Sequence, residues 1–142
     1  MGTWGPGPFD DDTAMDFVDH LLDLPSTQVE QELEAAVRIA CDAEDYLEYG
    51  DAVRAVVAAS LLAGLAPDGE AMWRSAIPLQ LTPNLAADAV EAIRRARSTG
   101  SHLHELTVES GTYAGVDKAL RPVLTVLQRI ALPVDPDQEP LF

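Results

Sequence analysis

The stretch AVRAVVAASLLAGLA, residues 52–66, is apolar around nearly its whole circumference when it is drawn as a helix. Arg54 is its only charged residue and falls in the first turn, where its side chain can reach solvent. A helix that is apolar on every side needs neighbours on several sides, so it belongs at the centre of a bundle. The apolar tract Ala55–Leu65 is too short to span a bilayer, so we expect the central helix of a soluble protein, capped by Asp51.

The segment before this stretch repeats apolar residues at helical spacing. In residues 13–24 the apolar positions recur at i, i+3, i+4, i+7 and i+8, and aspartates occupy the opposite face. Pro25 ends this amphipathic helix. Thr27 and Glu30 then predict a capping box for the next helix, which continues to Ala40.

Helix signals continue in the second half of the chain. Thr82 followed by Pro83 is an N-cap residue with proline at the first helical position, and Gly100 predicts the end of that helix. On its outer face Glu91 is spaced to pair with Arg95.

The last helical pattern reaches residue 131 and contains Pro122, which predicts either a kink or a helix start near Arg121. No run alternates with the period of a strand, so the pattern predicts an all-α, single-domain bundle of five to seven helices. The domain is expected to span residues 1–133 and to be followed by an acidic, proline-containing tail, residues 134–142.

Negative charge is concentrated in the first third of the chain. The net charge is −15, and residues 1–51 account for −13 of it, with fourteen carboxylates against the single Arg38. Such a field repels nucleic acids and anionic membranes and attracts cationic surfaces. The charge indicates either a surface that only keeps the protein soluble or a surface that binds a basic partner.

Residues 1–12, MGTWGPGPFDDD, carry no secretory signal and are expected to form an extended clasp on the bundle. Glycine and proline give this segment tight and stiff backbone, Trp4 and Phe9 supply apolar anchors, and one of the three aspartates caps the first helix. The same aspartates with Asp16 resemble a hard-cation cluster, but an EF-hand would need glycine at Met15 and glutamate at Leu21. Candidate binding residues are therefore Trp4, Phe9, Asp10, Asp11, Asp12, Asp16 and His20.

Catalytic patterns are missing from the sequence. The single Cys41 excludes an internal disulfide, fits a reducing cytoplasm, and sits beside Asp42, which raises a thiol pKa. His102 and His104 would point about 200° apart on a helix, so they could not chelate one ion there. We assign no catalytic residue, metal or cofactor.

The opening MGTWGPGPFDDDTAMDF resembles that of a bacterial family of unknown function. Its members begin Met-Gly-(Ala/Thr)-Trp-Gly-x-Gly-Pro-Phe-(Asp/Glu)-(Asn/Asp)-Asp. Weaker similarities are DYLE, residues 45–48, and HELTVESG, residues 104–111. The chain departs from the family in having Asp11 where asparagine is common. The resemblance implies a small cytoplasmic protein and no activity.

Two classes of function follow. The first is a non-enzymatic interaction module, similar to an immunity or antitoxin protein, that binds a basic partner through the acidic first third. The second is a divalent-metal-dependent enzyme or ion-binding protein that uses the N-terminal aspartates.

Overall fold

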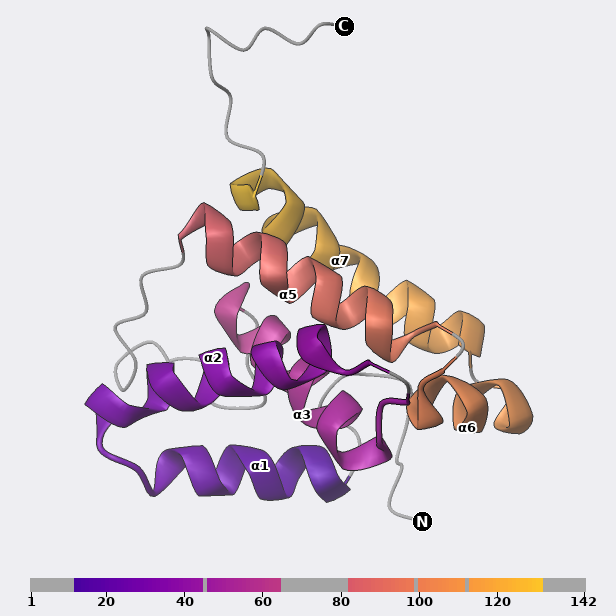
Figure 1. Cartoon of the computed structure of the whole chain (residues 1–142), viewed down its shortest axis with the longest axis horizontal. Coiled ribbons are helices and arrows are strands. Elements are labelled where there is room, and N and C mark those ends of the chain that lie inside the picture. Colours follow the sequence, from indigo (N-terminus) through magenta and orange to yellow (C-terminus); the bar gives the residue numbers. More distant parts are fainter. Residues whose placement is uncertain (1–11, 45, 65–81, 99, 112, 132–142) are drawn as a thin grey trace, which may run out of the picture.

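The computed structural model describes residues 12–44, 46–64, 82–98, 100–111 and 113–131, and six helices are found in these ranges (Figure 1). In chain order they are α1 (Asp12–Leu22), α2 (Ser26–Asp42), α3 (Tyr49–Leu62), α5 (Pro83–Ala96), α6 (His102–Ser110) and α7 (Tyr113–Ala131). In the same residues the β-type pairing is limited to one isolated parallel bridge between Leu47 and Ser101. The predicted all-α bundle of five to seven helices is confirmed.

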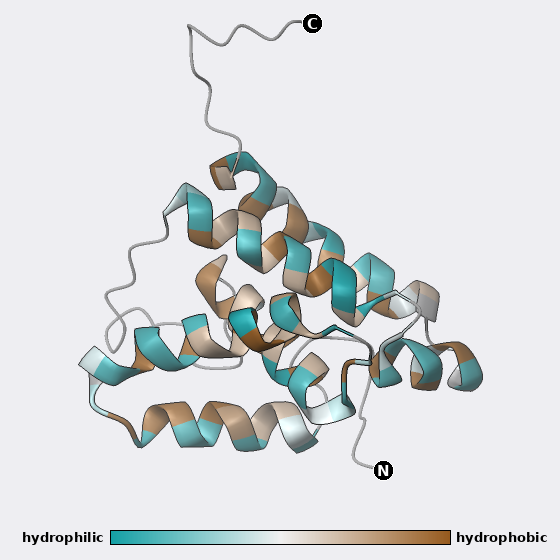
Figure 2. Ribbon diagram, viewed as in Figure 1, coloured by the Kyte–Doolittle hydropathy of each residue, from teal (hydrophilic) through white to brown (hydrophobic). Residues whose placement is uncertain are grey.

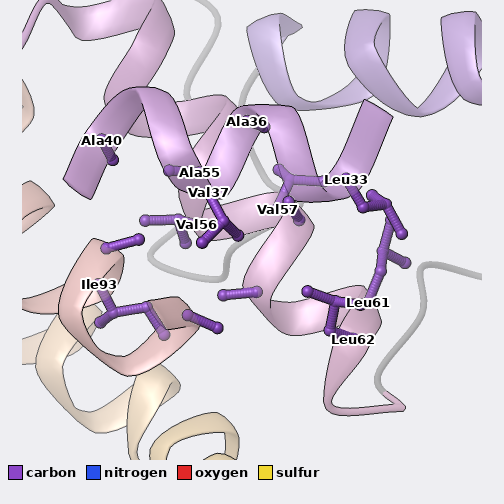
Figure 3. Close-up of a cluster of buried hydrophobic side chains, with 14 of the residues drawn as sticks. Leu33, Ala36, Val37, Ala40, Ala55, Val56, Val57, Leu61, Leu62 and Ile93 are labelled. Carbon is purple, nitrogen blue, oxygen red and sulfur yellow. The ribbon is translucent and has the colours of Figure 1, made fainter. Parts of the chain in front are cut away.

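Helix α3 lies at the centre of the bundle, as its apolar sequence predicts. Every residue from Ala55 to Leu62 is buried, because α3 contacts α1, α2, α5 and α6. Figure 3 shows Val56 and Val57 of α3 in one cluster with Leu33 of α2 and Ile93 of α5. The alanines and valines of α3 are small enough for its neighbours to pack closely around it.

The outer helices are apolar on one side only, and hydrophilic and hydrophobic residues alternate along them (Figure 2). Helix α1 buries Ala14, Phe17, Val18 and Leu21. At the other end of the bundle α7 packs against α5 and α6. None of the helices in the described ranges is both long and apolar enough to cross a bilayer.

Three predicted helix starts differ from the structure. Helix α2 begins at Ser26 with Pro25 at the N-cap, and no side chain caps it, so the predicted capping box of Thr27 and Glu30 is wrong. The extended backbone of Pro25 aims its carbonyl at the Gln28 N–H, 2.8 Å away, and this bond starts the helix earlier.

Helix α3 also begins earlier than predicted, at Tyr49, so Asp51 lies inside its first turn and does not cap it. Asp51 instead accepts a hydrogen bond from Arg54, one turn later, at 3.0 Å. The pair brings together the two charged side chains of this helix, and both stay partly exposed outside the core.

Helix α7 runs without interruption from Tyr113 through Pro122, so a helix start near Arg121 is wrong. Pro122 and Lys118 are both exposed. Water can therefore bond to the Lys118 carbonyl, which loses its helical donor at Pro122. A proline is tolerated here because the apolar residues that hold α7 to α5 lie on the other face.

The predicted start of α5 is confirmed, whereas the predicted end at Gly100 is wrong, because α5 ends at Ala96. The hydroxyl of Thr82 accepts a hydrogen bond from the Leu85 N–H at 3.1 Å, with Pro83 as the first helical residue. Gly111 ends α6 with a φ of +78°, a conformation that side-chain-bearing residues seldom adopt.

Candidate functional site

The predicted site residues fall into two groups. Trp4, Phe9, Asp10 and Asp11 lie outside the described residues, and so does most of the expected clasp. The remaining three, Asp12, Asp16 and His20, lie on α1, and all three are exposed. Helix α1 is an outer helix that packs against α3 and α2 and turns its polar side outward (Figure 1).

The polar side of α1 forms what we call the acidic face. It consists of four exposed residues of α1, Asp12, Asp16, Asp19 and His20, together with the exposed Asp23 just after the helix and Glu32 of α2. His20 Nε2 lies 3.7 Å from Glu32 Oε1, which joins the two helices. Arg38 is the one arginine or lysine in residues 12–51, and it lies near Glu34 at 3.3 Å and Asp88 at 3.9 Å.

The acidic face does not assemble a metal site within the described ranges. Asp16, His20 and Asp23 share the outer side of α1, but no three acidic, histidine or cysteine side chains of the described residues are close enough to hold one ion. The carboxylate that lies 3.7 Å from His20 belongs to another helix. The geometry therefore provides a surface of negative charge rather than a cage of ligands.

A second cluster was not predicted from the sequence. It consists of Tyr46, Tyr49, His102 and Glu105, and we call it the aromatic–acid cluster. The Tyr46 hydroxyl donates to Glu105 Oε1 at 2.9 Å, and the Tyr46 ring lies 6.2 Å from the His102 ring. The Tyr49 ring meets His102 edge-on at 5.9 Å.

The aromatic–acid cluster is assembled by the parallel bridge between two distant segments. The Leu47 N–H donates to the Gly100 carbonyl at 2.8 Å, and the His102 N–H donates to the Leu47 carbonyl at 3.0 Å. Leu47 itself is buried and anchors the connector between α2 and α3 against the start of α6 (Figure 1). The bridge thus fixes Tyr46 and Tyr49, on either side of Leu47, next to α6.

The surroundings of the Tyr46 phenol disfavour the loss of its proton. Loss of water contact, the hydrogen bond to Glu105 and the negative charges of Glu105 and Glu48 raise the pKa of Tyr46 above its usual value. The carboxylate is the acceptor in this bond, so a phenolate would repel it. Tyr46 therefore acts as a hydrogen-bond donor and an aromatic surface, not as a base.

Cys41 lacks the surroundings of a nucleophile. Burial, followed by the charges of Asp88, Glu91 and Asp42, raises the pKa of Cys41 to about 11. Its thiol lies 3.1 Å from the Asp88 carbonyl oxygen, which accepts its hydrogen bond. The sequence indicated a raised pKa from the adjacent carboxylate, but burial is the larger cause.

Alkylation of Cys41 by iodoacetamide is accordingly expected to be slow in the folded protein. At about pH 8 a thiol of this pKa is almost wholly protonated, so the rate should be on the order of a hundredfold below that of the chain unfolded in urea. The rate should then rise with each pH unit up to about 11. Equal rates in the folded and unfolded chains would contradict a partly buried, protonated thiol.

The three arginines near the end of α5 serve three separate contacts. Arg94 pairs with Glu91 at 2.5 Å, so the predicted pairing of Glu91 with Arg95 is wrong. Arg95 turns the other way and donates to the Ala43 carbonyl at 2.6 Å. Arg97 pairs with Asp117 of α7. Arg95 and Arg97 thus hold the end of α5 to a connector and to α7, whereas Arg94 pairs within α5 itself.

Fold and site together define a small all-α bundle with an acidic outer helix. Residues 2–119 match the model of a family described as a domain of unknown function, DUF4259, and the chain belongs to this family. The predicted membership of a family of unknown function is confirmed, whereas the opening motif itself stays a prediction. No curated protein and no solved structure matches the chain significantly.

Proposed function

We propose that the protein is a non-enzymatic interaction module whose acidic face binds a basic protein partner, as an immunity or antitoxin protein does. The observation that supports the proposal is the acidic face itself. Three exposed aspartates follow one side of α1 and a fourth, Asp23, comes just after the helix, while the charges of residues 12–51 include one arginine and no lysine. Two exposed apolar side chains, Met15 and Leu22, lie among these aspartates on α1.

This combination suits protein recognition better than solubility alone. Charges on an exposed helix attract an oppositely charged partner and raise the association rate, but they add little affinity unless apolar contacts accompany them. Met15 and Leu22 lie two turns apart on the same side of α1, with Asp19 between them. A partner that presents basic residues around apolar ones would complement this arrangement.

The alternative of a metal-dependent protein relies on Asp10 and Asp11, which lie outside the described residues. Calorimetry with Mg²⁺, Ca²⁺, Mn²⁺ and Zn²⁺ tests it directly. Heat of binding with a rise in melting temperature would favour the metal-dependent class over the interaction module.

The test of the proposal is calorimetric titration of the full chain with a capped lysine octapeptide at low ionic strength. Removing two charges from the acidic face, in Asp16→Asn with Asp23→Asn, is expected to weaken binding about three- to tenfold, since each exposed charge pair contributes up to about 1 kcal/mol. Added salt should weaken binding of the unchanged chain as well.

A matched control removes the same amount of charge elsewhere. The double variant Glu91→Gln with Glu109→Gln changes residues on α5 and α6, away from the acidic face, and is expected to weaken binding by less than twofold. Equal losses of affinity in the two double variants would show that binding depends only on the net charge of the chain. That result, or no binding by the unchanged chain, would overturn the proposal.

A further inference from the structure

Tyr46 stands out among the described residues as an exposed aromatic side chain that is nevertheless held in place. The residue is 40% exposed, yet its hydroxyl is hydrogen-bonded to Glu105 and its ring centroid lies 6.2 Å from that of His102. His102 is supported in turn by Tyr49. A ring whose orientation is fixed before a ligand arrives loses little conformational entropy on binding, which is the property of an interface anchor.

The charges around Tyr46 favour a cation on its exposed surface. The face of a phenol ring carries partial negative charge and attracts cations. Glu105 accepts the Tyr46 hydrogen bond through one oxygen, and Glu48 lies close enough for its charge to act on the same phenol. Both carboxylates are exposed. A cation over the ring would therefore meet aromatic and carboxylate groups together.

The groups around Tyr46 favour an arginine side chain over a lysine side chain. A guanidinium group is planar, stacks on an aromatic ring and donates hydrogen bonds from its edge to a carboxylate, whereas an ammonium group is a compact and strongly hydrated charge. One turn beyond Glu105, the exposed Val108 offers an apolar contact for the methylene groups of a long side chain. Aromatic face, carboxylate and apolar contact together suit arginine.

We infer that the aromatic–acid cluster is a receptor for an arginine side chain of the basic partner, with Tyr46 stacking on the guanidinium group and Glu105 accepting its hydrogen bonds. The inference rests on the proposed function and makes it more specific. The acidic face attracts a basic partner by charge, and the aromatic–acid cluster selects arginine over lysine at one position.

The experiment compares two capped octapeptides, one of arginine and one of lysine, in NMR titrations of the full chain. We expect the arginine peptide to bind more tightly and to shift the ring signals of Tyr46 and His102. Tyr46→Leu keeps an apolar side chain but removes the ring, and it is expected to weaken arginine binding about two- to fivefold while leaving lysine binding within twofold. Tyr46→Phe keeps the ring and should retain most of the preference.

The ratio of the two affinities separates this inference from the proposed function. Ile39→Ala changes an exposed apolar residue of α2 outside the cluster and should leave the ratio unaltered. If Tyr46→Leu also leaves the ratio unaltered while the Asp16 and Asp23 double variant weakens both peptides, the arginine receptor is overturned and the interaction module stands. If neither peptide binds the unchanged chain, both are overturned.

Discussion

Replacing Leu33 by alanine is expected to lower the free energy of unfolding by about 2–5 kcal/mol. Leu33 is fully buried on the inner side of α2 and belongs to the cluster that surrounds α3 (Figure 3). Removing three carbon atoms loses the favourable free energy of transferring them from water into the core. It also leaves a cavity that the small side chains of α3 cannot fill. Domains of this size have a total stability of about 5–15 kcal/mol, so the loss is a large part of it. Urea unfolding followed by circular dichroism measures it.

Leu22→Ala is the matched control, because it makes the same chemical change on an outer helix. Leu22 is 40% exposed at the end of α1, so its truncation is expected to cost less than about 1 kcal/mol. A similar loss in the two variants would contradict the central position of α3, since burial of Leu33 depends on the contact between α2 and α3.

The helical architecture could be predicted because it is encoded locally. The period of apolar residues in 13–24 and 27–40 marks the side that faces the core, and the stretch 52–66, which is apolar on nearly every side, requires a central position. Both expectations hold for the described residues, with Ala14, Phe17, Val18 and Leu21 buried on α1. Periodicity reports which side of a helix is buried without any knowledge of which helix covers it.

The exact helix starts could not be predicted, because capping residues compete with their neighbours. Thr27 and Glu30 have the spacing of a capping box, but the preceding proline already supplies an extended residue whose carbonyl begins the helix. Asp51 is a good N-cap residue, yet the bridge at Leu47 positions the chain so that α3 begins two residues before it. The neighbouring proline set the first start, and a contact between distant segments precedes the second.

The acidic face and the aromatic–acid cluster also differ in how far the sequence could predict them. The acidic face could be predicted in part, because Asp16 and His20 share one side of a helix that the sequence itself defines. The aromatic–acid cluster could not, because Tyr46 and Glu105 are 59 residues apart and meet only through the bridge between Leu47 and Ser101. Nothing in a local pattern specifies a contact between residues so far apart in the sequence.

Asp117→Ala is expected to lower the free energy of unfolding by about 2–3 kcal/mol, since removing one partner of a poorly hydrated ion pair leaves the other with its desolvation cost. Asp117 joins α7 to α5 by pairing with Arg97, whose side chain is only 14% exposed. Its other oxygen lies 3.3 Å from Arg121, which is 73% exposed.

Arg121→Ala removes the exposed partner of the Asp117 carboxylate. It is expected to change the free energy of unfolding by less than about 0.5 kcal/mol, because water already screens that pair. Thermal unfolding of both variants measures the difference. Equal, small effects would mean that Arg97 is as well hydrated as Arg121 and that apolar packing of Leu120, Val123 and Leu127 alone holds α7 in place. A large effect confined to Asp117→Ala would show that this partly buried pair fixes how α7 lies on α5.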